Sequence, residues 1–222
     1  MVRPVFKTGE GYIGTPGGFD SHTLPPNNII IITNIWDILM ARIAYPDISE
    51  LSEDVQALAA RINPMLNVFR MLAHAESAYY GFMKLGNALL MKSELDPVLR
   101  EIIILRVGHL SKSSYEIYQH EKIARHVGVS LDKIKALSSG ENEKVFDYIE
   151  NIAIRFTDEV VHSIKAHQNT FDTISKYLNP RQLNEVILII GFYMMVCRYL
   201  ENLEIDIEEE GDVDPTLNFV PD

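Results

Sequence analysis

From Leu51 onward, apolar residues recur every three to four positions, which is the spacing of one face of an α-helix. Outside residues 29–33, no segment alternates apolar and polar side chains as a half-buried strand does. The sequence therefore predicts an all-α fold, with a last helix that ends near Leu203. Helices are also expected over residues 51–62 and 141–166, and one or two helices over residues 65–92.

Two of the expected helices begin with clear N-terminal signals. Asp96 precedes Pro97, and Asn179 precedes Pro180, so in each case a capping side chain stands before a proline at the first helical position. Gln182 completes a capping box at the second site. The helix after Asp96 has apolar residues on nearly all sides, so we expect it at the centre of the domain.

Three ionisable residues stand among these apolar residues. Glu101 belongs to the helix that begins at Pro97, whereas Glu116 and His120 are four positions apart and share one face of the next helix, which is expected to end at Gly128. Burial raises the pKa of a carboxyl group, and a neighbouring carboxylate raises that of a histidine. Both effects move the pKa values toward neutral pH, where a general acid or base works best. The three residues are therefore a candidate catalytic triad.

Two other interpretations of this pattern stay open. Ser113 and Glu116 fit a capping box, in which Glu116 would only satisfy the main-chain N–H of Ser113. An inward histidine such as His120 can also be a hydrogen-bonded core residue without a catalytic role.

The stretch from Arg100 to Gly128 resembles the carboxymuconolactone decarboxylase family, which is related to alkylhydroperoxidase D. The peroxidase branch has a glutamate, a Cys-x-x-Cys that starts twelve residues later, and a histidine four residues after the second cysteine. Glu101 and His120 match that pattern, but Ser113 and Glu116 occupy the two cysteine positions. A glutamate four residues before the histidine is the pattern of the decarboxylase branch. The resemblance covers roughly residues 43–208.

The resemblance implies an alkylhydroperoxidase D-like helical bundle and a homo-oligomer, expected as a trimer or hexamer with a dimer as the alternative. It also implies a cofactor-independent decarboxylase, a lyase, that acts on a small carboxylated lactone or oxo acid. In this hypothesis His120 delivers the proton to the substrate. Glu116 holds or reprotonates the His120 side chain, and Glu101 completes a hydrogen-bonded triad. The alternatives are an isomerase or dehydratase with the same triad, or a non-enzymatic oligomeric helical module. Further substrate contacts are expected from Tyr115, Arg106, Ser113, Tyr193 and His74.

Cysteine and metal chemistry are not expected. Cys197 is the only cysteine, which excludes an intramolecular disulfide and a Cys-x-x-Cys redox pair, and with them thiol peroxidase chemistry. Glu159 and His162 have the spacing of a di-iron motif, but such sites need a second copy, so no metal site is expected. No cofactor-binding fingerprint is visible either.

Charge is concentrated at the end of the chain. The formal net charge is −11, and residues 199–222 hold nine acidic residues with no lysine or arginine. Without a basic stripe, nucleic acid is not an expected partner. The longest apolar run, Val186 to Cys197, has twelve residues and is too short to cross a bilayer. We therefore expect no membrane partner and a cytoplasmic location.

The sequence predicts three regions. Residues 1–42 are expected to form an N-terminal arm, which is irregular over residues 1–28 because that part is rich in glycine and proline. Its apolar residues 29–32 pack either on their own domain or on a neighbouring subunit, and we favour the second. Residues 43–205 form the helical domain. Residues 206–222 form an acidic tail, expected to lie in solvent.

Overall fold

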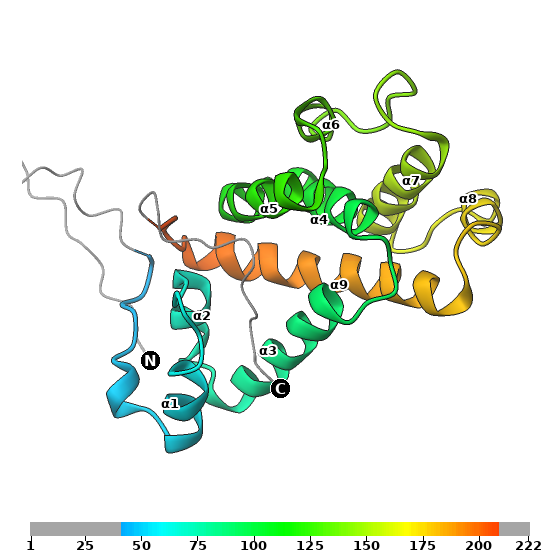
Figure 1. Ribbon diagram of the computed structural model, residues 1–222. Coiled ribbons are helices and arrows are strands. Elements are labelled where there is room, and N and C mark those ends of the chain that lie inside the picture. Colours follow the sequence, from blue (N-terminus) through cyan, green and yellow to red (C-terminus); the bar gives the residue numbers. More distant parts are fainter. Residues whose placement is uncertain (1–40, 209–222) are drawn as a thin grey trace, which may run out of the picture. The chain divides into compact units, whose positions relative to one another are not determined.

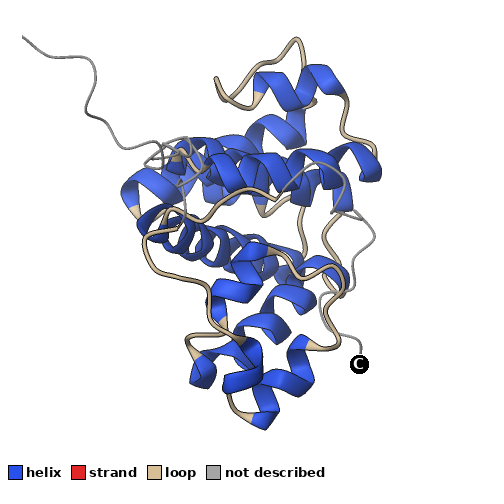
Figure 2. Cartoon of the chain, turned by 90° about the vertical axis from the view of Figure 1, so that its left-hand side faces the viewer, coloured by secondary structure: helices blue, strands red, loops and turns tan. Residues whose placement is uncertain are grey.

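In the computed structural model, residues 41–208 are described, and the chain divides into two units, Met1–Asp37 and Ile38–Asp222. All regular structure within residues 41–208 is helical, without a strand, which confirms the all-α prediction (Figure 2). Residues 29–33 and the rest of the N-terminal arm up to residue 40 lie outside this range. The elements are η2 (Ile48–Glu50), α1 (Glu53–Ala59), α2 (Asn67–Leu72), α3 (Glu76–Met91), α4 (Pro97–Ser111), α5 (Ser114–Val127), α6 (Leu131–Ala136), α7 (Tyr148–Ser163), α8 (Gln168–Ile174) and α9 (Pro180–Leu203).

Helix α4 lies at the centre of the described domain, as its sequence predicts. Every residue from Leu99 to Gly108 is buried, and the helix packs against α5, α7 and α9 (Figure 1). Its apolar side chains are shared between two hydrophobic clusters: Ile103 belongs to the larger one, and Ile102 to a smaller one beside α6 and α7. The Asp96 carboxylate caps the helix by accepting hydrogen bonds from two main-chain N–H groups. The residues on α4 therefore have fixed positions.

Helix α9 runs through the same core. The expected capping box is present, since Asn179 and Gln182 each accept a hydrogen bond from the other's main-chain N–H. Among the described helices, α9 is the one long and apolar enough to cross a membrane by length and composition. The same composition is needed by a helix that packs, as α9 does here, on α3, α4, α5 and α7.

The start of α7 differs from the sequence prediction. A helix was expected over residues 141–166, but α7 begins only at Tyr148. The Asp147 side chain accepts a hydrogen bond from the N–H of Glu150, and Glu150 accepts one from the N–H of Asp147. Before this cap, the Asn142 carbonyl accepts bonds from the N–H groups of Val145 and Phe146, so residues 142–146 form a turn. The periodic pattern alone did not show this break, which is set by the Asp147 cap.

The first residues of the expected acidic tail are bound to the domain. The Asp206 carboxylate accepts hydrogen bonds from the main-chain N–H of Ala41 and from the Tyr45 hydroxyl. The side-chain amide of Asn67 donates to the carbonyl of Asp206 at 3.0 Å. These bonds hold the chain after α9 against residues 41–45 and the start of α2. The rest of the tail, from residue 209, lies outside the described residues.

Candidate active site

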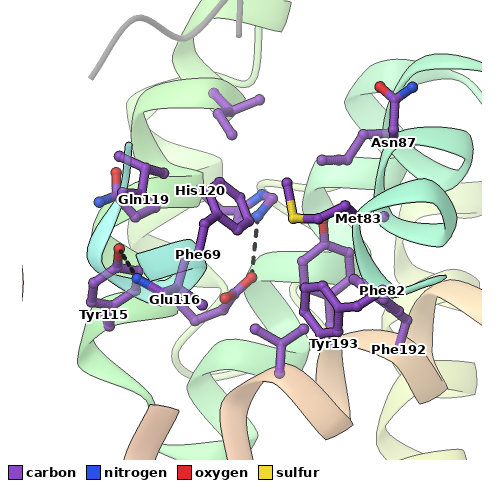
Figure 3. Close-up of a pocket in the computed structure, with 16 residues that line it drawn as sticks. Phe69, Phe82, Met83, Asn87, Tyr115, Glu116, Gln119, His120, Phe192 and Tyr193 are labelled. Atoms are coloured by element: carbon purple, nitrogen blue, oxygen red, sulfur yellow. Dashed lines mark hydrogen bonds and ion pairs between the residues drawn. The ribbon is translucent and has the colours of Figure 1, made fainter. Parts of the chain in front are cut away.

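Glu101, Glu116 and His120 come together between α4 and α5. His120 Nδ1 lies 2.7 Å from Glu101 Oε2. On the other side of the ring, His120 Nε2 lies 3.1 Å from Glu116 Oε1 (Figure 3). The exposed fractions of the three residues are 0%, 4% and 6%. The contact with Glu116 has the distance of an ion pair, but the Glu116 oxygen is not in hydrogen-bonding geometry. His120 therefore has one well-formed partner and one loosely held neighbour.

Arg100 is a member of this site that the sequence did not indicate. Its Nε donates to Glu101 Oε1 at 3.2 Å, and Arg100 itself is 8% exposed. One carboxylate oxygen of Glu101 thus faces a guanidinium while the other holds His120. Adjacent positions on a helix do not normally share a face, so no sequence pattern connected Arg100 with Glu101. The arrangement compensates the buried carboxylate and fixes the imidazole orientation.

The surroundings change the proton affinities of both groups that face the cavity. Burial raises the pKa of Glu116 to about 7, with a further contribution from Glu101 that is opposed by His120. Burial alone would lower the pKa of His120, but the carboxylates of Glu116 and Glu101 together raise it above its ordinary value. A carboxyl group that is partly protonated at neutral pH, next to a histidine that holds its proton, can exchange protons with a ligand.

A cavity lies beside Glu116 and His120. Its volume for the centres of water molecules is about 70 Å³, where one water needs roughly 10–15 Å³. The walls are mostly apolar and aromatic, and a few polar groups face inward, as in many small-molecule sites. The lining residues come from α2, the chain before it, α3, α5 and α9 (Figure 3): Leu66, Val68, Phe69, Phe82, Met83, Gly86, Asn87, Leu90, Tyr115, Glu116, Gln119, His120, Ile123, Phe192, Tyr193 and Val196.

The capping-box interpretation of Glu116 is wrong. Ser113 is the N-cap of α5, yet neither its side chain nor that of Glu116 makes a capping hydrogen bond there. Glu116 instead turns toward His120 and lines the cavity. The capping box does not form, because α4 and α9 pack against α5 and this face of the helix points into the domain.

Two of the expected substrate contacts lie at the cavity. Tyr115 and Tyr193 both line it, on opposite sides of His120 (Figure 3). The rings of Tyr193 and His120 meet edge to face, with centroids 4.9 Å apart and planes at 84°. Burial, followed by Glu116 and Glu101, raises the pKa of Tyr193 well above its usual value, so its hydroxyl remains a donor. Their predicted roles in substrate binding stay predictions.

The other three expected contacts lie elsewhere, which corrects their expected positions. Arg106 donates two hydrogen bonds to Asp158 and others to the carbonyls of Leu137 and Ser138, so it joins α4 to α7. Ser113 is fully buried outside the cavity lining. His74 is exposed, and its Nε2 lies 2.8 Å from the Ala44 carbonyl. The positions of Arg106 and His74 are set by partners distant in sequence.

Two polar residues at the cavity were missed by the sequence analysis, and a third stands beside it. Gln119 and Asn87 line the cavity, and Glu208 binds Tyr115 and Gln119 at its side. Gln119 directly precedes His120, and Glu208 belongs to a segment expected to lie in solvent. The helix period could have placed Asn87 on the same face as Met83. No sequence signal connects Glu208 to the site.

Cys197 and the Glu159/His162 pair are not arranged for redox or metal chemistry. Cys197 is fully buried, does not line the cavity, and burial raises its pKa to about 12. His162 Nδ1 lies 2.8 Å from the carbonyl of Asp158, whereas Glu159 accepts from His167 and Thr170. Within residues 41–208, no cluster of three His, Cys, Asp or Glu side chains could hold a metal ion.

The fold is that of alkylhydroperoxidase D-like proteins, which confirms the expected bundle. A peroxidase-related protein from Ralstonia eutropha JMP134, described as an alkylhydroperoxidase AhpD core, superposes with a TM-score of 0.65 at 18% identity over 82% of this chain and 98% of its own. A peroxidase-related protein from Silicibacter sp. TM1040 gives 0.66 at 18% identity over 77% and 93%. A single-residue variant of the debrominase Bmp8, in complex with 2,3,4-tribromopyrrole, gives 0.62 at 14% identity over 77% and 93%.

Within this class, residues 76–141 match the model of the Carboxymuconolactone decarboxylase family. The match confirms the resemblance seen in the sequence, and it covers α3 to α6 with Glu101, Glu116 and His120. The similarity to this family thus rests on residues 76–141, which include Ser113 and Glu116 at the two positions expected for cysteines in the peroxidase branch. No curated protein matched the chain in the sequence comparison.

Proposed function

We propose that this protein is a cofactor-independent decarboxylase that acts on a small carboxylated lactone or oxo acid by general acid/base catalysis. The supporting observation is that Glu116 and His120, both with raised pKa values, lie side by side on the wall of a cavity. The aromatic lining suits a small ring. A ring also occurs in the complex of the debrominase Bmp8 with 2,3,4-tribromopyrrole, a protein of the same fold.

The reaction needs an electron sink and a proton donor. When the C–C bond to the carboxylate breaks, CO₂ leaves and the bonding electrons move into the neighbouring carbonyl of the substrate, which gives an enolate. His120 then donates a proton to the enolate carbon and becomes neutral. Glu116, 3.1 Å away and protonated in part near neutral pH, returns a proton to His120 and takes one from solvent. The net change is one proton consumed and one CO₂ released.

Glu101 and Arg100 act on His120 without touching the substrate. Neither residue lines the cavity. Glu101 accepts the hydrogen bond from Nδ1, which leaves Nε2 as the nitrogen on the Glu116 side. Arg100 compensates the charge of Glu101 in turn. The two residues thus position His120 and support its protonated form.

Replacement of His120 by alanine tests this proposal. A panel of small carboxylated lactones and oxo acids is assayed for CO₂ release, which also separates decarboxylation from isomerisation and dehydration. With a substrate in hand, we expect turnover to fall by about 10² to 10⁴, the usual contribution of a general acid. His126→Ala, an exposed histidine of the same helix, is the matched control and should leave turnover unchanged.

Circular dichroism gives the folded fraction of each variant, to which rates are normalised. A folded His120→Ala variant that keeps full turnover contradicts the proposal. If the wild type releases no CO₂ from any acid of the panel but isomerises or dehydrates one of them, the triad serves that chemistry instead of decarboxylation. The homo-oligomer and the cytoplasmic location stay predictions.

A further inference from the structure

Glu208 places a carboxylate at the side of the cavity, held by three donors from the domain. The main-chain N–H of Asn67 donates to Glu208 Oε1 at 2.5 Å, and the Tyr115 hydroxyl donates to the same oxygen. The Gln119 side-chain amide donates to Oε2. Tyr115 and Gln119 are 4% and 6% exposed, and both line the cavity. A carboxylate of the chain itself is therefore already bound to two residues of the cavity wall.

The donor set suits an anion. The Tyr115 hydroxyl accepts a hydrogen bond from the N–H of Val68 at 3.4 Å, so its proton points toward Glu208. Burial, together with Glu208, raises the pKa of Tyr115, which keeps this proton in place. All three groups offer hydrogen atoms to the two oxygens, an arrangement that is stronger with an ionised acceptor than with a neutral one. None of the three donors is charged, so these contacts hold Glu208 by hydrogen bonds and not by an ion pair.

The segment that carries Glu208 can release it without disturbing the helices. Within residues 41–208, the last main-chain group that a side chain of the domain binds is the carbonyl of Asp206, held by Asn67. Ile207 follows with 41% exposure, and Glu208 comes next. A change in the side-chain and backbone angles of these two residues removes the carboxylate from its donors, while α9 ends earlier, at Leu203. Glu208 is thus a local and displaceable occupant.

We propose that Tyr115, Gln119 and the N–H of Asn67 form a carboxylate subsite, which Glu208 fills in the free protein and which the carboxylate of an acid ligand takes in its place. The inference rests on the proposed function, because it assigns the groups that hold the acid substrate. It also explains how a cavity whose described lining has no arginine or lysine can bind an acid. Arg106, the expected partner of that carboxylate, bonds to Asp158 instead.

Binding of benzoate to the full chain tests the subsite without any need for turnover. If Glu208 occupies the donors about nine-tenths of the time, Glu208→Ala tightens benzoate binding about tenfold, since the apparent dissociation constant scales with the open fraction. Isothermal titration calorimetry measures this constant. Benzyl alcohol, which has the ring but no carboxylate, should bind both proteins equally. Glu204→Ala is the matched control, because it removes one carboxylate from the same segment, where Glu204 pairs with the exposed Arg42.

The double variant Tyr115→Phe, Glu208→Ala separates the subsite from a general effect of charge. It should lose the gain that Glu208→Ala produces, because the phenyl ring keeps the shape and lacks the donor. Circular dichroism checks its folding, and Gln119→Leu in the same background replaces it if it does not fold.

Any of four results overturns the inference. Benzoate binds Glu208→Ala no more tightly than the wild type, or the affinity for benzyl alcohol rises as much as that for benzoate. Glu204→Ala has the same effect as Glu208→Ala, or the full gain in affinity remains without the Tyr115 hydroxyl. A chain that decarboxylates nothing can still show the benzoate effect, and a decarboxylase can fail to show it. The failure of this inference is therefore distinct from failure of the proposed function.

Discussion

Replacement of Glu116 by glutamine tests the electrostatics of the site through stability. Burial raises the pKa of this carboxyl group from 4.5 to about 7 in the folded protein. At 1.36 kcal/mol for each unit of pKa, ionisation of Glu116 costs the folded state about 3 kcal/mol relative to the unfolded chain. Glutamine keeps the shape of the side chain and cannot ionise, so the variant is free of this penalty.

The sign follows from where each state loses its proton. Below pH 4.5, Glu116 is protonated in both states and contributes no difference. Between pH 4.5 and about 7 the folded state keeps a proton that the unfolded state has lost, so stability falls as pH rises. His120 acts in the same direction, because its raised pKa adds stability below pH 6.5 that is lost as pH rises through the folded value. Loss of Glu116 also removes part of that His120 effect.

Urea unfolding at pH 5, 6, 7 and 8 measures the prediction. Between pH 5 and pH 8, the free energy of unfolding of the Glu116→Gln variant should rise relative to the wild type by about 3 kcal/mol. Glu121→Gln removes the same formal charge from the same helix, at a residue paired with Arg125, and controls for net charge. Parallel profiles for the wild type and Glu116→Gln would refute the reasoning, as would an equal change in the Glu121 variant.

Two further variants test positions outside the cavity. Arg106→Ala should lower the free energy of unfolding by about 3 kcal/mol, because it leaves Asp158 and the Leu137 carbonyl without their partner. Urea unfolding measures this loss. A fall in turnover per folded molecule would contradict the position of Arg106 away from the site. Gly128→Ala should lower the free energy of unfolding by about 1–2 kcal/mol, because Gly128 has a φ of 102°, which L side chains rarely adopt. The added methyl group meets open space, so the penalty comes from the backbone alone. Thermal melting shows the effect, and an unchanged melting temperature would exclude the strain.

Features of the fold that depend on neighbouring residues were predictable. The cap at Asp96, the capping box at Asn179 and the left-handed C-terminal glycine at Gly128 all act within a few residues along the chain, and all three are confirmed. The central position of α4 followed from apolar residues around its whole axis. The start of α7 at Tyr148 was missed, because a periodic apolar pattern continues through a turn as readily as through a helix.

The candidate site was predictable only in part. Glu101, Glu116 and His120 could be selected because charged groups at apolar helix positions need partners, and the structure brings the three together. The choice between a capping and a cavity-facing Glu116 could not be made locally, since the spacing fits both. The expected contacts Arg106 and His74 were misplaced, because each has a partner that only the packing of distant elements supplies. Ser113 was misplaced because it is fully buried away from the cavity.

The sequence by itself determined the helical class, the helix ends marked by caps, and the identity of three ionisable residues that had to lie inside. Such properties depend on spacing along one helix, which is fixed by the geometry of the backbone. Only the tertiary structure decided that Arg100 compensates Glu101, that a cavity lies beside His120, and that Glu208 lies against Tyr115 and Gln119. Contacts between residues far apart in sequence arise when helices pack, and no local period encodes which side chains will then meet.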